Sequence, residues 1–230
     1  MVCFMKILSF TFEEYVERVQ TFHGFAAPGV VIGGFMIELA YQHLPKEAFL
    51  RAICETPQCL PDAIQILTAK TVGNGRLTVI NLGRFALTFY DISNGEGVRV
   101  FLDQTKVEAW PEIKNWFFKL KSKKEQNYSV LMEQIRESGT GICGIERVRV
   151  ASQLLEKNRR GSIAICPRCK EAYPLADGPV CLGCRGQAPS VTSEVEIDSK
   201  QELPQPSSFH GSWEKSPQSC FAYYRKLKNC

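Results

Sequence analysis

Four of the ten cysteines in this 230-residue sequence stand in two Cys-x-x-Cys pairs. Cys166-x-x-Cys169 is followed, after eleven residues, by Cys181-x-x-Cys184. Each pair can deliver two thiolates to one Zn²⁺, and four thiolates complete its tetrahedral shell. We therefore predict a structural zinc finger, in which metal binding supplies about 10 kcal/mol of folding free energy. The alternatives are two unrelated cysteine pairs or a redox dithiol.

The residues between the two pairs indicate what this finger does. Asp177-Gly178 is expected to form the turn of a small hairpin. A closed Cys₄ site has no open coordination position, which favours a structural or docking module over catalysis. Basic residues surround it, so RNA or DNA binding stays open, although a solvated basic face is the commoner explanation. These residues are Lys157, Arg159, Arg160, Arg168, Lys170 and Arg185.

His23 is the second candidate for chemistry, and it is one of three histidines in the chain. The cysteine and acid nearest to it in the sequence are Cys59 and Asp62, which lie one helical turn apart. Taken alone, a histidine of this kind is more often a structural residue, and Cys59 is more often a buried thiol. The functional alternatives are a metal site using His23 and Cys59, or a catalytic pair in which Cys59 is the nucleophile and His23 the base.

The elements that position these residues are predicted from periodicity and turn signals. Helices are expected at about 10–22, 28–43, 60–71, 111–120 and 129–137, and strands at 48–56, 76–82, 85–92, 97–104 and 145–150. The helix after Trp110 is expected to bury a stripe of Ile113, Trp116, Phe117 and Leu120. The fold class is therefore α+β, with helices packed on an antiparallel meander sheet.

Composition divides the chain into three parts. We predict a core domain at 1–160, the Cys₄ finger at 161–186 and a disordered tail at 187–230, where Ser, Pro, Glu and Gln dominate. The net charge of +4 is too small to indicate a nucleic-acid or membrane partner. The longest apolar run, from Phe25 to Ile37, is too short to span a bilayer. A cytoplasmic protein with no membrane partner is expected.

Several linked motifs resemble a known family. The sequence reads FHG-x-x-x-PG at 22–29, ET-x-x-C-x-x-DAIQ-x-LT at 55–68 and TVGNG-x-L at 71–77, and a meander follows. In this order the motifs resemble the E-subunit family of formylmethanofuran dehydrogenase. The cysteine pairs are similar to the treble-clef or ribbon finger that some members carry. The resemblance implies an α+β core, paired as a homodimer, with a metal-binding cavity lined by the first two motifs.

The chain departs from the family pattern at the first motif. That pattern reads FHGH-x-CPG, whereas this chain has Phe25 and Ala27 in place of the second histidine and the cysteine. His23 and Cys59 then remain as ligands of a depleted core site, which Asp62 or a second protomer would have to complete. A lysine common in the family near the meander is replaced by Arg84, which keeps the positive charge.

Three functions follow from these observations. The first is an accessory metal-binding protein with a ligand- or protein-binding core, a structural zinc finger and a depleted core metal site. The second is an enzyme of unknown reaction, in which Cys59 and His23 react and Arg84 and Asp62 hold a small anionic ligand. The third is nucleic-acid binding through the finger and the basic stretch 114–124, which ranks last because Trp116 and Phe117 are better explained as core.

Overall fold

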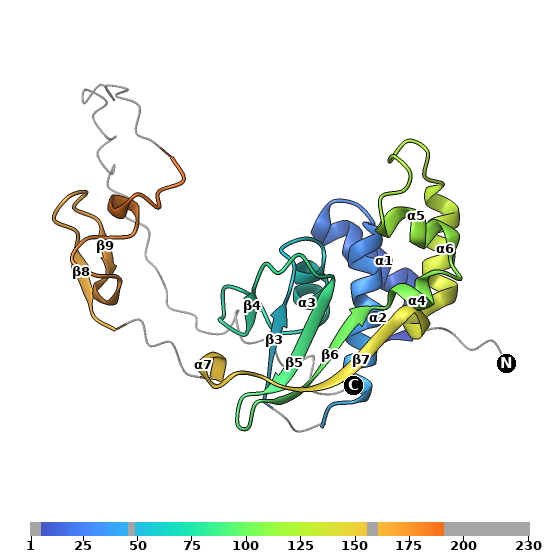
Figure 1. Cartoon of the computed structure of the whole chain (residues 1–230), viewed down its shortest axis with the longest axis horizontal. Coiled ribbons are helices and arrows are strands. Elements are labelled where there is room, and N and C mark those ends of the chain that lie inside the picture. The colour runs from blue at the N-terminus through green and yellow to red at the C-terminus, as the bar shows by residue number, and fades with distance from the viewer. Residues whose placement is uncertain (1–5, 46–48, 156–160, 191–230) are drawn as a thin grey trace, which may run out of the picture. The chain divides into compact units, whose positions relative to one another are not determined.

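The computed structural model describes residues 6–45, 49–155 and 161–190 (Figure 1). They fall into two units that divide between Asn158 and Arg159. No helix within these residues combines the length and the apolar character needed to cross a membrane. The predicted tail from 191 onward lies outside the described residues.

A five-stranded sheet with the order β4-β3-β5-β6-β7 forms the base of the first unit. Its strands are β3 (Leu50–Cys54), β4 (Leu77–Val79), β5 (Ala86–Asp91), β6 (Glu96–Leu102) and β7 (Cys143–Arg149). Neighbouring strands are antiparallel except for β3 and β4, which are parallel. The α+β class is confirmed, but the expected antiparallel meander is wrong for this edge. Helix α3 (Leu60–Leu67) connects β3 to β4, and a helical crossover returns the chain in the same direction.

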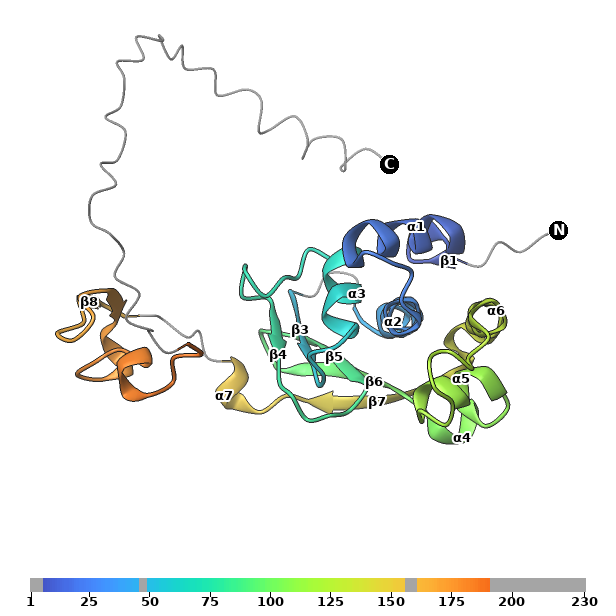
Figure 2. The same cartoon turned by 90° about the horizontal axis from the view of Figure 1, so that it is seen from above.

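The remaining elements of this unit lie beside the sheet. They are β1 (Lys6–Ile7), β2 (Phe10–Thr11), α1 (Phe12–His23), α2 (Pro28–Gln42), α4 (Gln104–Val107), α5 (Pro111–Phe117), α6 (Tyr128–Ser138), a 3₁₀ turn (Gly139–Ile142) and α7 (Ser152–Leu155). Figure 2 shows α1, α2 and α3 on one side of the sheet, and α4, α5 and α6 gathered at the end where β6 and β7 lie.

The expected apolar stripe of α5 is only partly correct. Ile113 is fully buried, and Trp116 and Phe117 pack against the core. Leu120, in contrast, is 59% exposed. The reason is that the helix ends at Phe117 and the chain then turns at Lys119, whose φ of 54° is left-handed, so the last position of the stripe no longer lies on the helix.

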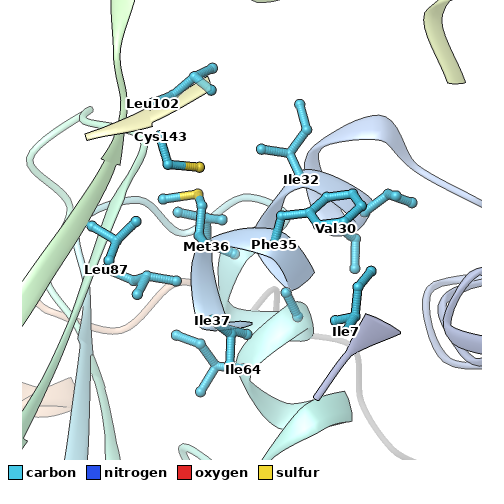
Figure 3. Close-up of a cluster of buried hydrophobic side chains, with 14 of the residues drawn as sticks. Ile7, Val30, Ile32, Phe35, Met36, Ile37, Ile64, Leu87, Leu102 and Cys143 are labelled. Carbon is cyan, nitrogen blue, oxygen red and sulfur yellow. The ribbon is translucent and has the colours of Figure 1, made fainter. Parts of the chain in front are cut away.

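Helix α2 is the centre of the core. Its sequence is apolar almost throughout, and ten of its fifteen residues are buried. In Figure 3 the side chains of Phe35 and Met36 lie in the middle of the buried cluster, with Leu87 and Leu102 on the side of the strands. The approach of α3 is close, because a Cβ placed on Gly33 would lie 2.6 Å from the Cβ of Ala63. Glycine at this position therefore sets the distance between α2 and α3.

The second unit contains a small hairpin of β8 (Ile163–Ile165) and β9 (Ala172–Pro174). The connection between these strands is the segment that carries the first cysteine pair. The expected hairpin turn at Asp177-Gly178 is wrong, because Asp177 ends a 3₁₀ turn (Leu175–Asp177) that follows β9. A second 3₁₀ turn, Gly183–Arg185, carries the last cysteine.

Candidate metal and thiol sites

The four finger cysteines converge on one point. The sulfur atoms of Cys166, Cys169, Cys181 and Cys184 all lie within 4.8 Å of one another. The Sγ atoms of Cys169 and Cys181 are 3.6 Å apart. A tetrahedral Zn²⁺ with bonds of about 2.3 Å requires sulfur separations of about 3.8 Å, so this donor set fits zinc. Four thiolates would fill its shell, which gives the metal a structural role.

Local backbone geometry holds these cysteines in place. Cys166 directly follows β8, and its carbonyl accepts a hydrogen bond from the Lys170 amide at 2.9 Å, which closes the first turn. In the second pair the Cys184 amide donates to the Cys181 sulfur at 3.4 Å. Arg168 donates from its guanidinium to the Cys184 carbonyl at 3.1 Å and so ties the two turns together. Part of the basic character of the finger therefore serves its own fold.

His23 is placed by the end of α1. The helix begins with a capping box formed by Thr11 and Glu14, and it ends at Gly24, whose φ of 92° requires a left-handed conformation. His23 is the last helical residue, and its Nδ1 lies 2.6 Å from the Oδ2 of Asp62 in the first turn of α3. Both side chains are partly buried. The structure thus brings together two residues that are 39 positions apart in the sequence.

Cys59 lies immediately before α3 in a strained conformation. Its φ of 60° and ψ of −58° are rare for a residue with a side chain. The thiol packs against the first turn of α2, where a Cβ added to Gly29 would lie 2.8 Å from the Cys59 sulfur and 3.4 Å from the Trp116 ring. Burial, and secondarily the negative charge of Asp62, raise the pKa of the Cys59 thiol.

The core residues do not form a multi-ligand metal site by themselves. Across residues 6–45, 49–155 and 161–190, the finger cysteines are the only three or more His, Cys, Asp and Glu side chains whose ligand atoms lie this close together. His23 engages Asp62 through Nδ1, and the ring of Phe25 stands 5.2 Å from the His23 ring. Ala27 is buried at the start of α2. The two positions that depart from the family pattern therefore flank His23 with apolar side chains.

Arg84 pairs with a buried acid that sequence reasoning did not single out. The Nε of Arg84 lies 2.7 Å from Glu55, whose side chain is 7% exposed. Arg99 binds the same carboxylate at 2.7 and 3.0 Å and also reaches Glu146. Hydrogen bonds from Arg99, with the charges of Arg99 and Arg84, hold the pKa of Glu55 below its usual range. The available signal was an acid placed directly after the apolar end of β3.

The finger geometry predicts the effect of removing a ligand. Replacing any one of Cys166, Cys169, Cys181 or Cys184 by Ser should release about one zinc per chain and unfold residues 163–186, because metal binding supplies the folding free energy of so small a unit. Elemental analysis would count the zinc, and urea unfolding would report on the core, which should be unchanged. The variant Cys230→Ser is the control and should retain its zinc. Unchanged zinc in all four ligand variants would contradict the assignment.

Comparison with known proteins places both parts of the chain. Residues 22–151 match the family model described as FmdE, molybdenum formylmethanofuran dehydrogenase operon. Residues 157–190 match the model described as the FmdE treble clef zinc finger. This second match identifies the finger as a treble clef, one of the two forms expected from the sequence.

Two proteins illustrate the similarity. The crystal structure of an FmdE-like protein of tungsten formylmethanofuran dehydrogenase, from Syntrophus aciditrophicus, has 51% sequence identity and a TM-score of 0.75, over 81% of this chain and 98% of that one. A protein of Archaeoglobus fulgidus described as a probable S-adenosyl-L-methionine-binding protein is 29% identical over 190 residues, which are 74% of this chain and 52% of the relative. The chain thus spans about half the length of this curated relative. Because the first family model covers more than half of its residues, the chain belongs to the FmdE family and carries that family's treble-clef zinc finger.

Proposed function

We propose that this chain is an accessory metal-binding protein, in which the zinc finger is a docking module and the core binds a small anionic ligand or a protein partner as a homodimer. The observation that carries this proposal is the contrast between the two donor sets. Four sulfur atoms converge in the finger, whereas His23, Cys59 and Asp62 do not form such a group within the described part of the core. The proposal includes a core metal site that is depleted.

Exposed aromatic side chains beside His23 support the homodimer. Phe25 is 56% exposed, and Phe118 and Tyr128 are also exposed. They belong to one region, because the Tyr128 hydroxyl donates to the Ala26 carbonyl at 2.6 Å. Phe118 joins the region through Phe117, which packs on Trp116 beside the start of α2. We call Phe25, Phe118 and Tyr128 the aromatic patch. Aromatic side chains gathered at a surface are typical of protein interfaces.

Light scattering tests the homodimer. The full-length protein should have twice the mass of one chain at micromolar concentration, and Phe118→Glu should shift it to the monomer, because a buried charge at an interface is costly. Phe49→Glu is the matched control, since Phe49 is equally an exposed phenylalanine but lies at the start of β3. A protein that is monomeric at all concentrations, or a variant Phe118→Glu with unchanged dimer affinity, would contradict the proposal.

The depleted core site is tested by restoring the family residues. Phe25→His with Ala27→Cys should raise the zinc content of the full-length protein from about one to about two per chain, because imidazole and thiolate donors would join His23 and Cys59. Phe22→His with Ala26→Cys introduces the same residue types in the same loop and should leave the content near one. A full equivalent of metal in an unmodified chain that ends at Arg160 would show that the core site is not depleted.

A specific observation favours the enzyme as the second candidate. Cys59 keeps a strained backbone, and its thiol lies against the start of α2, where Gly29 leaves room for it. Strain of this kind is concentrated at functional sites. The His23–Asp62 pair lies on neighbouring elements and resembles a base with the carboxylate that orients it. The raised pKa of Cys59 counts against a reactive thiolate in the free protein.

Alkylation of Cys59 tests this second candidate. Because the charge of Asp62 contributes to the raised pKa, Asp62→Asn should lower that pKa and speed the reaction with iodoacetamide at pH 8 roughly threefold, as half a pKa unit requires. Peptide mass spectrometry would follow Cys59 separately from the finger cysteines. Asp103→Asn, at the start of α4, is the control and should leave the rate unchanged. A Cys59 thiol that resists alkylation in the native protein and in Asp62→Asn would remove the main support for a nucleophile.

A further inference from the structure

The finger hairpin has an open edge. Within residues 161–190, β8 pairs with β9 alone, in the register Ile163↔Pro174, Ala164↔Tyr173 and Ile165↔Ala172. The three residues of β8 read Ile-Ala-Ile. An edge strand of this kind is a template for pairing with another strand.

The hydrogen-bond pattern of the hairpin shows which groups point to the open edge. The Cys166 amide donates to the Glu171 carbonyl, and the Leu175 amide donates to the Ser162 carbonyl, both at 2.8 Å. Pairs in an antiparallel ladder alternate between bonded and non-bonded, so Ala164 is bonded to Tyr173 while Ile163 and Ile165 are not bonded to β9. Their N–H and C=O groups therefore point away from the hairpin. Pro174, which lies opposite Ile163 and has no N–H, agrees with this phase.

The side chains of the same two residues form an exposed apolar face. Ile163 is 61% exposed and Ile165 is 65% exposed. Tyr173 is buried and Ala164 is half-buried on the opposite face, which is turned toward the inside of the finger. The two isoleucines thus present both their backbone groups and their side chains outward.

This edge is complementary to itself. A second β8 placed antiparallel about a two-fold axis through Ala164 sets Ile163 of one copy opposite Ile165 of the other. In that register every outward N–H and C=O of these residues meets a partner, and both isoleucines of each copy lie on one shared face. A shift by one residue would place the isoleucines on opposite faces of the joined sheet. We infer that β8 of the finger pairs with β8 of a second copy of this chain.

The inference rests on the proposed homodimer. Two short strands bury far less surface than the roughly 1,200 Å² of a stable interface, so the pairing would not hold free chains together. A homodimeric core would keep the two fingers at a high effective concentration, at which a weak pairing becomes populated. The finger would then be ordered in the homodimer as a four-stranded sheet with a zinc site on each side of the axis.

The test uses full-length, zinc-loaded protein at a concentration where light scattering shows the dimer. The amides of Ile163 and Ile165 should exchange slowly with solvent, as that of Ala164 does through its bond to Tyr173. In Ile165→Lys the exchange of the Ile163 amide should accelerate on the order of tenfold or more, while Ala164 stays protected. Leu175→Lys, an exposed leucine beyond β9, is the matched control and should change neither amide. Zinc content should stay at one per chain in both variants.

A mixed dimer of differently labelled chains identifies the partner strand. Nuclear Overhauser contacts should appear between the Ile163 methyl groups of one copy and the Ile165 methyl groups of the other. A dimer with freely exchanging Ile163 and Ile165 amides overturns this inference and leaves the proposed function intact, whereas a monomer at all concentrations overturns both. Protection without the contacts between copies, or protection lost from a dimeric chain that ends at Ser190, would show that another segment covers β8 and would also overturn it.

Discussion

The close packing of α2 against its neighbours is the constraint on which the core depends. A Cβ on Gly33 would collide with Ala63 of α3, and a Cβ on Gly29 would collide with the Cys59 thiol just before α3. Because α2 and α3 touch in this way, the end of α1 is carried over the first turn of α3, and His23 reaches Asp62. The pairing of these two residues is therefore a consequence of helix packing, and the unusual backbone of Cys59 belongs to the same contact.

Two different sources of stability operate along the chain. The core buries a continuous apolar cluster around α2 and does not require a metal. The finger has little apolar interior, with Tyr173 as its main buried aromatic side chain, and its four thiolates converge for a metal ion instead. Such a division suits a protein in which one part holds a ligand or a partner copy and the other part docks. It also explains why exposed isoleucines are tolerated on β8, since the metal rather than a core fixes the hairpin.

The charges of the core are largely satisfied within it. Glu55 is buried and would be costly to keep ionised by itself, and two arginines neutralise it. Arg84 consequently has a structural partner, and any anion bound by its guanidinium would share that charge with Glu55. His23 likewise has a carboxylate partner within hydrogen-bond distance. The sites proposed for ligands are therefore built on ion pairs that also hold the local fold together.

The sequence by itself determined what depends on local spacing. The two Cys-x-x-Cys pairs identified the zinc ligands, because each pair forms its turn from adjacent residues. Apolar periodicity and the proline after Ala27 located α2 within a residue or two. The fold class and the family followed from the order of such local patterns.

Only the tertiary structure decided what depends on contacts between distant segments. The parallel placement of β4, the partner of Arg84 and the position of Asp62 relative to His23 each join residues many positions apart, which no local pattern encodes. The hairpin turn was misplaced for a related reason, since the metal-binding turn occupies the connection where a short glycine turn was expected. The exposed edge of β8 also required the structure, because burial depends on what lies against a strand in space rather than on its residues.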